Sequence, residues 1–266
     1  MKARVGGRLR FGVSGAAPLS AEIAEFFHAL DILILEGYGQ TELTTACSVN
    51  RPDRFRFGTV GPPLPGFEIR IADDGEVVVR SETIFAGYLK DKAATREVLD
   101  EDGWLRTGDV GELDEDGFLT ITDRKRDIIV TAGGKNVAPQ NIENALKRSK
   151  LLSHALVVGD RRPYLTALVT LDEEGARTWA RERGLDGDAE ALSRDERVRD
   201  AVQEIVDEVN AERARFEQVK RFAILPRDFS AERDEVTPTL KLRRRACEEH
   251  FAGVIDELYE APAAPS

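Results

Sequence analysis

The first 50 residues alternate between strand patterns and helix patterns, and this alternation restricts the fold more than any other feature of the sequence. Apolar runs at 9–13 and 32–35 have the length of short buried strands. A helix is predicted to begin near Ser20, a residue type that caps helices, and the segment 43–49 is compatible with a second helix. Alternating strands and helices favour a parallel sheet, so we expect an α/β arrangement at residues 8–56.

A different pattern follows, in which short alternating strands are separated by Gly, Pro and Asp, with Asp-Gly turns at 74–75 and 116–117. Residues 57–123 are therefore typical of a small, mostly antiparallel barrel or sheet. Because the first strand already leads into a ligand-binding type of turn, we expect residues 1–123 to be the remnant of a larger, doubly wound α/β domain. The antiparallel strands are predicted at 67–71, 76–80 and 118–122.

The remaining sequence, residues 124–260, predicts a separate α+β domain. It begins in the charged cluster 123–127 and ends before a tail, 261–266, that is predicted to be disordered. Its strands are predicted at 128–131, 155–158, 165–171 and 221–225. Its helices are predicted around Ile142 and Leu146, across the charged region 172–216, and at 242–258.

Charge and cysteine content exclude several classes of function. The formal net charge of −11 disfavours nucleic-acid binding, even through the basic segment 241–245, because phosphate backbones bind positively charged surfaces. Cys47 and Cys247 are far apart and outside any metal-ligand spacing, which indicates free thiols in a reducing cytosol. Three histidines without an H-x-x-H pattern argue against a zinc site. No apolar run reaches the roughly 18 residues of a membrane span, so we expect a cytoplasmic protein.

Residues 37–42, Gly-Tyr-Gly-Gln-Thr-Glu, directly follow a predicted buried strand. Open α/β sheets bind ligands at the carboxyl ends of their strands. Tyr38 could therefore offer its ring and nearby backbone groups to a flat ligand, and Glu42 could hold Mg2+ on a nucleotide phosphate. The alternative is a strand-turn-helix junction with a structural role only, which is common.

Two further turns carry residues that suit a nucleotide. The small residues Ala16, Ala17 and Pro18 would let a planar base lie against the backbone, although they suit any tight turn. Asp109 ends a Thr-Gly-Asp turn, where its carboxylate could accept two hydrogen bonds from a ribose diol. The alternative for Asp109 is a side chain that caps only its own turn.

The second domain contributes a basic cluster, a glycine pair and a lysine. The planar guanidinium of Arg124 suits phosphate and ribose oxygens, and Gly133 and Gly134 would let a thin substrate arm pass close to the backbone. Lys241 precedes the last predicted helix and could neutralise charge that develops on a phosphoryl or carboxylate oxygen. The alternatives are a solvated linker, a hairpin turn and a solvated helix start.

In this order the motifs resemble those of the adenylate-forming superfamily, which contains acyl-CoA synthetases, luciferases and adenylation domains of peptide synthetases. The similarity runs from about residue 8 to residue 258, and residues 133–143 and 237–243 are most similar to bacterial long-chain fatty-acid–CoA ligases. The resemblance implies that a fatty acid attacks the α-phosphate of ATP·Mg2+ to give an acyl-adenylate and pyrophosphate. CoA would then displace AMP to give the thioester. The motifs are Tyr38-Gly39-Gln40-Thr41-Glu42, Gly87-Tyr88-Leu89-Lys90, Thr107-Gly108-Asp109, the block 123–143 and Pro238-Thr239-Leu240-Lys241.

The resemblance assigns the nucleotide pocket mainly to the first domain. Asp109 would hold the ribose hydroxyls, Glu42 would hold Mg2+, and Arg124 would contact the ribose or a phosphate. Thr41, Glu42 and Lys241 would be the catalytic residues. The adenine and the α-phosphate would be lined by Ala16, Ala17, Pro18, Glu36, Gly37, Tyr38, Gly39, Gln40 and Thr41.

The resemblance also implies a mobile carboxy-terminal domain that turns about Arg126 between the two steps. Lys241 would bridge carboxylate and phosphate during adenylation only. Gly133 and Gly134 would face the pantetheine arm of CoA during thioester formation, with Asn136 facing the nucleotide.

The sequence departs from the family pattern in one respect, because no Thr/Ser/Gly-rich phosphate loop precedes residue 8. We therefore expect the carboxy-terminal half of a longer enzyme, inactive without its amino-terminal part and prone to self-association through exposed apolar sheet surface. For a ligase of hydrophobic acids, peripheral contact with a membrane is a further expectation. The alternatives are a non-catalytic fragment that binds nucleotide or a partner, and a ligase for a medium-chain or aromatic acid.

Overall fold

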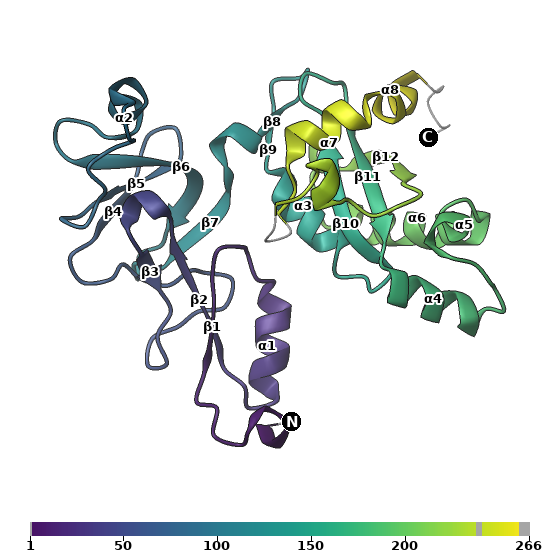
Figure 1. The fold of residues 1–266 in the computed structure, drawn as a ribbon, viewed down its shortest axis with the longest axis horizontal. Coiled ribbons are helices and arrows are strands. Elements are labelled where there is room, and N and C mark those ends of the chain that lie inside the picture. The colour runs from purple at the N-terminus through teal and green to yellow at the C-terminus, as the bar shows by residue number, and fades with distance from the viewer. Residues whose placement is uncertain (1, 238–240, 261–266) are drawn as a thin grey trace. The chain divides into compact units, whose positions relative to one another are not determined.

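The computed structural model describes residues 2–237 and 241–260, which form two compact units, Met1–Arg126 and Asp127–Ser266 (Figure 1). The sequence pattern alone places the domain boundary between 123 and 124. The structure places it later because Arg124 and Lys125 form ion pairs with Asp109 and Asp74 of the first unit. Residues 238–240 and the predicted tail 261–266 lie outside the described residues.

The first unit begins with a three-stranded sheet and a helix beside it (Figure 1). The bounds are η1 Lys2–Val5, β1 Gly12–Ser14, α1 Ala21–Ala29, β2 Ile34–Gly39, η2 Thr41–Leu43 and β3 Ala46–Val49. The strand order is β1-β2-β3; β1 and β2 are parallel, with Ser14 opposite Glu36, and β2 and β3 are antiparallel. The parallel pair with its connecting helix confirms the predicted α/β arrangement.

The predicted second helix at 43–49 is wrong. Only the short 3-10 turn η2 forms, and the chain then extends as β3. Thr44 adopts a left-handed φ of 69°, which ends the turn. Pairing of β3 with β2 buries Cys47 and Ser48 completely, so tertiary contacts outweigh the local compatibility with a helix.

The rest of the first unit is a four-stranded antiparallel sheet in chain order. The bounds are β4 Glu68–Ile71, β5 Glu76–Arg80, α2 Lys92–Val98, β6 Trp104–Leu113 and β7 Leu119–Arg124. The antiparallel pairing matches the prediction for residues 57–123, but β6 is missing from it, because the Thr-Gly-Asp turn at 107–109 interrupts the alternating pattern. Buried Val77, Val79, Leu105 and Leu119 share one core with Leu43 and Cys47, so the two sheets pack on each other.

The second unit is a three-stranded sheet with helices, preceded by the short hairpin of β8 and β9. The bounds of its first part are η3 Lys125–Asp127, which spans the unit boundary, β8 Ile129–Val130, β9 Asn136–Val137, α3 Pro139–Leu146, β10 Leu152–Val158 and β11 Leu165–Leu171. Those of its second part are α4 Glu173–Glu182, α5 Ala189–Leu192, α6 Glu196–Ala211, η4 Arg215–Glu217, β12 Val219–Ile224, η5 Ala231–Arg233, α7 Arg244–His250 and α8 Ala252–Glu260. β10 and β11 are antiparallel, whereas β11 and β12 are parallel.

The sheet of the second unit is covered on both faces, and β11 is buried along its whole length. Leu165, Ala167 and Val169 point into a core that also contains Ile142 of α3 and Val202 of α6. Leu168 points the other way, into a core formed with α7 and α8. This burial on both faces explains why β11 is mostly apolar and shows no alternation of apolar and polar residues.

Two predicted helices are divided in the structure. The region 172–216 forms α4, α5, α6 and η4. Between α4 and α5 the chain turns at Gly184 (φ 67°) and Gly187 (φ 155°). The closing helix at 242–258 forms α7 and α8, which are separated at Phe251. Across the described residues, every helix is too short or too polar to span a bilayer.

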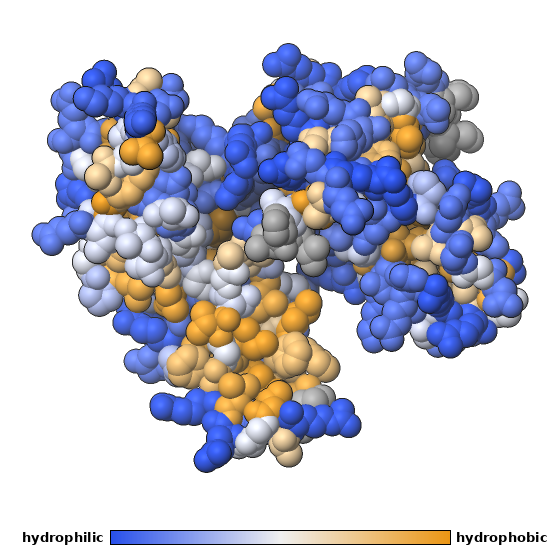
Figure 2. Space-filling model, in the orientation of Figure 1, coloured by the Kyte–Doolittle hydropathy of each residue, from blue (hydrophilic) through white to orange (hydrophobic). Residues whose placement is uncertain are grey.

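Apolar side chains gather on the surface of the first unit around β1 and α1, seen at the bottom of Figure 2. Val13 is 64% exposed and Phe26 is 60% exposed, which is unusual for such residues. An apolar surface of this kind favours burial against another protein surface. Self-association of the chain stays a prediction. The exposed residues are Val5, Phe11, Val13, Ile23 and Phe26.

Candidate functional site

The turns after β1 and β2 lie next to each other, because the two strands are parallel and end at the same edge of their sheet. This arrangement brings Ala16, Ala17 and Pro18 close to residues 36–41. The backbone N–H of Leu19 donates a 2.9 Å hydrogen bond to Oε1 of Glu36, which ties the first turn to β2. Burial raises the pKa of the Glu36 carboxyl, and this hydrogen bond opposes the shift.

The predicted turn at Gly37-Tyr38-Gly39 is instead the end of β2, because these residues pair with β3. The second glycine is needed for this packing. A Cβ atom at Gly39 would lie 2.2 Å from the carbonyl oxygen of Thr45, which no side chain tolerates. At Gly37 a Cβ atom would meet the Val49 side chain at 3.1 Å, a tight contact. Gly39 therefore lets β2 and β3 approach.

Tyr38, Asp109 and Arg124 come together from three distant segments. The Tyr38 hydroxyl donates a 2.5 Å hydrogen bond to Oδ2 of Asp109, and Nε of Arg124 lies 3.4 Å from Oδ1 of the same carboxylate. Asp109 and Arg124 face each other on β6 and β7. Burial and the charge of Asp109 raise the pKa of Tyr38, so the phenol stays a hydrogen-bond donor. Asp109 thus does not merely cap its own turn.

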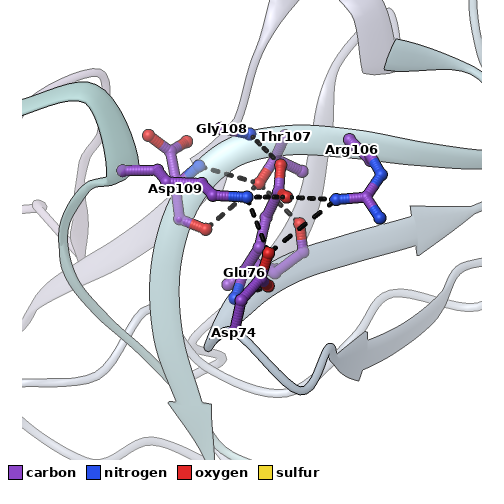
Figure 3. A network of polar contacts seen from close by, with 8 residues as sticks. Asp74, Glu76, Arg106, Thr107, Gly108 and Asp109 are labelled. Carbon is purple, nitrogen blue, oxygen red and sulfur yellow. Dashed lines mark hydrogen bonds and ion pairs between the residues drawn. The ribbon is translucent and has the colours of Figure 1, made fainter. Parts of the chain in front are cut away.

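A bulge in β6 sets the direction of Asp109. Val78 pairs with Arg106, and the next pair of the ladder joins Glu76 to Val110. Thr107, Gly108 and Asp109 therefore stand opposite a single residue of β5, and Gly108 adopts a φ of 72°. Figure 3 shows the polar contacts that surround this bulge.

Glu42 lies on η2, the short 3-10 turn that follows β2 in the first unit. Its Oε1 accepts a 2.8 Å hydrogen bond from the hydroxyl of Tyr88, whose pKa is raised by this bond. Thr41 begins η2 and is exposed. Nε2 of Gln40 is buried without a hydrogen-bond partner, which is a costly state that a ligand acceptor would relieve.

A cavity of about 530 Å3 lies beside Gln40, Glu42 and Tyr88, and its lining does not include Tyr38 or Asp109. The described residues contain no cluster of three or more His, Cys, Asp or Glu side chains that could hold a metal ion by itself. Glu42 nevertheless fits Mg2+, because this ion is commonly bound by one or two carboxylates together with substrate phosphates and water. The cavity is lined by Gln40, Glu42, Glu76, Tyr88, Glu97, Val98, Arg106, Thr107, Gly108 and Lys125.

In the second unit, the glycine pair forms the turn between β8 and β9. Gly134 has a φ of 72° and its N–H donates to the carbonyl of Thr131 at 2.8 Å. A Cβ atom at Gly133 would have its nearest neighbour at 3.9 Å, the Thr131 hydroxyl oxygen. Asn136 follows on β9, opposite Val130, and is exposed. The backbone beside Gly133 is therefore open to a ligand.

Lys241 is exposed, and its backbone pairs with that of Thr237. Its N–H donates to Oγ1 of Thr237 at 3.0 Å, and its carbonyl accepts the N–H of Thr237 at 2.8 Å. The base of the loop is held by Glu235, a fully buried carboxylate that pairs with both Nη atoms of Arg227. The motif residues Pro238, Thr239 and Leu240 lie outside the described residues.

The structure thus places the predicted residues in groups. Within the first unit, Tyr38, Asp109 and Arg124 are in contact, and Glu42 is held by Tyr88. In the second unit, the glycine turn and Lys241 occupy two loops, and Arg126 is the last residue before that unit. Sequence reasoning gave no role to Tyr88, although the residue lies in a recognised motif. It also gave none to Glu76 and Lys125, whose contacts no local pattern signals.

The comparisons with known proteins cover both units. Residues 126–263 match the family described as AMP-binding enzyme C-terminal domain, and residues 1–89 match the family described as AMP-binding enzyme. A long-chain-fatty-acid–CoA ligase from Mycobacterium bovis is 42% identical over 261 residues, which are 97% of this chain and 43% of that protein. The chain therefore spans less than half the length of this curated relative.

Two solved structures show the same fold. The adenylation domain of a carboxylate reductase from Mycobacterium chelonae gives a TM-score of 0.77 at 28% identity, over 98% of this chain and 40% of that one. The A domain of a carboxylic acid reductase from Segniliparus rugosus, solved in complex with AMP and a co-purified carboxylic acid, gives 0.76 at 26% identity. That match covers 97% of this chain and 41% of the other.

Proposed function

Because the chain belongs to the AMP-binding enzyme family, we propose that it acts in the AMP-forming ligation of a long-chain fatty acid to CoA. The substrate class is supported by the similarity to a ligase of that name. The observation that carries the nucleotide role is the contact of Tyr38 and Arg124 with one buried carboxylate, Asp109.

Asp109 is the residue that would hold the ribose diol. The residue is 7% exposed; Oδ2 of its carboxylate accepts the Tyr38 hydroxyl, and Nε of Arg124 lies beside Oδ1. Carboxylate oxygens accept hydrogen bonds from hydroxyl groups, which is the role proposed for Asp109. The other N–H groups of Arg124 remain suited to a phosphate or ribose oxygen, in the fork geometry that favours such groups. The adenine would lie against the turns at 16–18 and 37–41.

The proposed chemistry begins with attack of the fatty-acid carboxylate on the α-phosphate of ATP, which releases pyrophosphate. Glu42 would hold Mg2+, which supplies neutralisation of phosphate charge when bound. Thr41 would contact the phosphate from the exposed start of η2. The ammonium of Lys241 would stabilise the negative charge shared by carboxylate and phosphate in the transition state.

In the second step the CoA thiolate attacks the acyl-adenylate carbonyl, and AMP leaves. Gly133 and Gly134 would border the pantetheine arm, since the backbone at Gly133 is open, and Asn136 would face the nucleotide. Arg126 would be the pivot between the two steps, because it ends the first compact unit.

A chimera tests the ligase function. The matching segment of the M. bovis relative is replaced by this chain, and formation of palmitoyl-CoA and AMP from palmitate, ATP and CoA is measured. We expect activity that falls at least about a hundredfold in Lys241→Ala, since one transition-state charge contact is removed. A chimera that folds but makes no acyl-CoA from palmitate contradicts the proposal. Activity with octanoate or benzoate instead of palmitate supports the alternative of a ligase for a medium-chain or aromatic acid.

Experiments on the isolated chain distinguish nucleotide binding from catalytic turnover. Calorimetric titration with AMP should show binding that is lost in Asp109→Ala. ATP–pyrophosphate exchange with palmitate should be absent for the chain alone, so clear exchange would overturn that expectation. Binding without activity in the chimera favours the alternative of a non-catalytic nucleotide-binding protein.

The proposal includes a cytoplasmic location with peripheral membrane contact. It is supported by two buried cysteines that stay free thiols, Cys47 and Cys247, as expected in a reducing compartment. Cell fractionation of a tagged protein, with and without a high-salt wash of membranes, checks both parts.

A further inference from the structure

Glu76 is a buried carboxylate in the cavity wall for which the proposed reaction has no use. It begins β5, directly after the Asp74-Gly75 turn, and is 3% exposed. A buried carboxylate is costly unless it is paired and hydrogen-bonded. Glu76 accepts from three donors: the Gly108 N–H at 3.0 Å, Arg106 Nη1 at 2.8 Å and Lys125 Nζ at 3.0 Å.

The first contact holds the bulge that carries Asp109 (Figure 3). Oε1 of Glu76 accepts the N–H of Gly108, in the place of the strand carbonyl that a regular ladder would supply. Oγ1 of Thr107 completes the bulge, since it donates to the Val77 carbonyl at 2.6 Å and accepts the Asp109 N–H at 3.1 Å. Two side chains thus satisfy the backbone of the bulge and fix where Asp109 points.

The third contact holds the end of the first unit. Nζ of Lys125 bridges Oε2 of Glu76 and Oδ2 of Asp74, the latter at 2.7 Å. Hydrogen bonds to Asp74 and then to Glu76 raise the pKa of Lys125, which stays charged. Lys125 directly precedes Arg126, and Arg124 before it contacts Asp109. Consecutive residues are therefore attached to Asp109 and to Glu76.

The network balances its own charge. Asp74 and Glu76 face Arg106 and Lys125, so two carboxylates meet two cations. Lys125 is already paired twice, which disfavours a direct role of its ammonium on a phosphate. The geometry instead suits a structural connection between the bulge and the segment at 124–126.

We propose that Glu76 is a positioning residue that couples the nucleotide-binding carboxylate Asp109 to Lys125, next to the pivot of the two units. The inference rests on the proposed nucleotide role of Asp109. Loss of the Glu76 charge leaves Lys125 held by Asp74 alone and weakens the hold on the bulge, so AMP binding and the order of the segment at 124–126 change together.

A double-mutant cycle on AMP affinity tests the coupling. Calorimetry compares the wild-type chain with Glu76→Gln, Lys125→Met and the double variant. Glu68→Gln is the matched control, because Glu68 pairs with Arg80 on the same sheet at an exposed position. We expect a loss of roughly tenfold in Glu76→Gln, a smaller loss in Lys125→Met, and no further loss in the double variant. Equal effects of Lys125→Met in both backgrounds, or an unchanged affinity in Glu76→Gln, overturn the proposal.

Hydrogen exchange gives a readout that does not require a nucleotide. Glu76→Gln should speed amide exchange in both segments, 106–109 and 124–126, while Glu68→Gln should leave both unchanged. Faster exchange at 106–109 alone shows a local structural role and contradicts the coupling. A wild-type chain that binds no AMP refutes the nucleotide role of Asp109, and the exchange result still decides whether Glu76 joins the two segments.

Discussion

The hydroxyl oxygen of Tyr38 lies 2.5 Å from Oδ2 of Asp109, although 71 positions separate the two residues in the sequence. This contact joins the last residues of β2 to the bulge of β6. It brings two sequence motifs together around one carboxylate. The predictions below follow from this contact and from the packing around the other candidate residues.

Tyr38→Phe should weaken AMP binding by about tenfold. A hydrogen bond to a charged group contributes roughly 1.5 kcal/mol or more, and its loss leaves Asp109 free to turn away from the ribose. Calorimetry of the isolated chain measures the effect. Tyr164→Phe is the control, because its hydroxyl donates to the Leu258 carbonyl in the other unit. Equal affinities of Tyr38→Phe and wild type would show that the phenol does not position Asp109.

Tyr88→Phe should weaken the binding of ATP with Mg2+ but not the binding of AMP. The Tyr88 hydroxyl orients Glu42 through a 2.8 Å hydrogen bond. Its removal should weaken binding of ATP with Mg2+ by about fivefold, roughly 1 kcal/mol. Binding of AMP without metal should not change. A similar loss for both ligands argues against Glu42 as the Mg2+ ligand.

Alanine substitutions should distinguish Gly39, which is needed for packing, from Gly133, which is proposed to border CoA. Gly39→Ala should destabilise the first unit, because its Cβ atom would lie 2.2 Å from a backbone oxygen. Gly133→Ala should leave folding intact, since its nearest neighbour would be 3.9 Å away. In the ligase chimera, Gly133→Ala should slow acyl-CoA formation more than pyrophosphate exchange. Thermal unfolding measures the stability of both variants, and the two assays measure the rates of Gly133→Ala. Equal slowing of pyrophosphate exchange and acyl-CoA formation would contradict a role of Gly133 beside CoA.

Arg244→Met should destabilise the second unit by about 3 kcal/mol, the usual cost of leaving one member of a buried ion pair alone. Arg244 donates to Oε1 of Glu143 at 2.6 Å and to the Val157 carbonyl at 2.7 Å. Urea unfolding followed by Trp179 fluorescence, in a Trp104→Phe background, reports this unit alone. The double variant with Glu143→Leu should recover part of the loss. No recovery would show that the pair is not the cause.

The second unit should lose stability in acid. Hydrogen bonds from Arg227 lower the pKa of Glu235 to about 2, against the effect of burial. Burial alone would raise the pKa of Asp228, but hydrogen bonds from His154 and two hydroxyl groups lower it to about 2. Both folded-state values lie below the unfolded ones, so the stabilisation is complete above about pH 4.5 and is lost as the pH falls toward 2.

Thermal unfolding between pH 7 and pH 2.5 checks this pH dependence. Wild type should show a steep fall of the melting temperature below pH 4.5. Glu235→Gln should start lower at pH 7 and fall less steeply, because one titrating group is removed. Parallel curves for the two proteins would exclude Glu235 as a source of the acid sensitivity.

Local sequence patterns were sufficient for much of the fold. Parallel β1 and β2 with α1 between them, the antiparallel strands around 67–80, and the mostly apolar β11 follow from periodicity and turn residues. The errors have common causes. The residues of β3 suit both a helix and a strand, so their pattern predicts a helix, and the bulge in β6 interrupts the alternation that would predict a strand.

The candidate site was predicted in part. Tyr38, Asp109 and Arg124 stand in motifs that the sequence displays, and the structure brings them into contact. Tyr88 lies in a motif as well, but only the coordinates show that it holds Glu42. Nothing in the sequence marks Glu76, which looks like any acidic residue after an Asp-Gly turn.

The sequence by itself determined the order of the motifs, the alternation of strands and helices, and so the family to which the chain belongs. These properties are local, because each depends on residue types within a few positions. Only the tertiary structure decided that a bulge removes Asp109 from the pairing of β6 with β5, that Glu76 satisfies the freed N–H of Gly108, and that Lys125 belongs to the first unit. Such features depend on the register between strands that are distant in the chain, and register is fixed by packing and hydrogen bonding across the whole sheet.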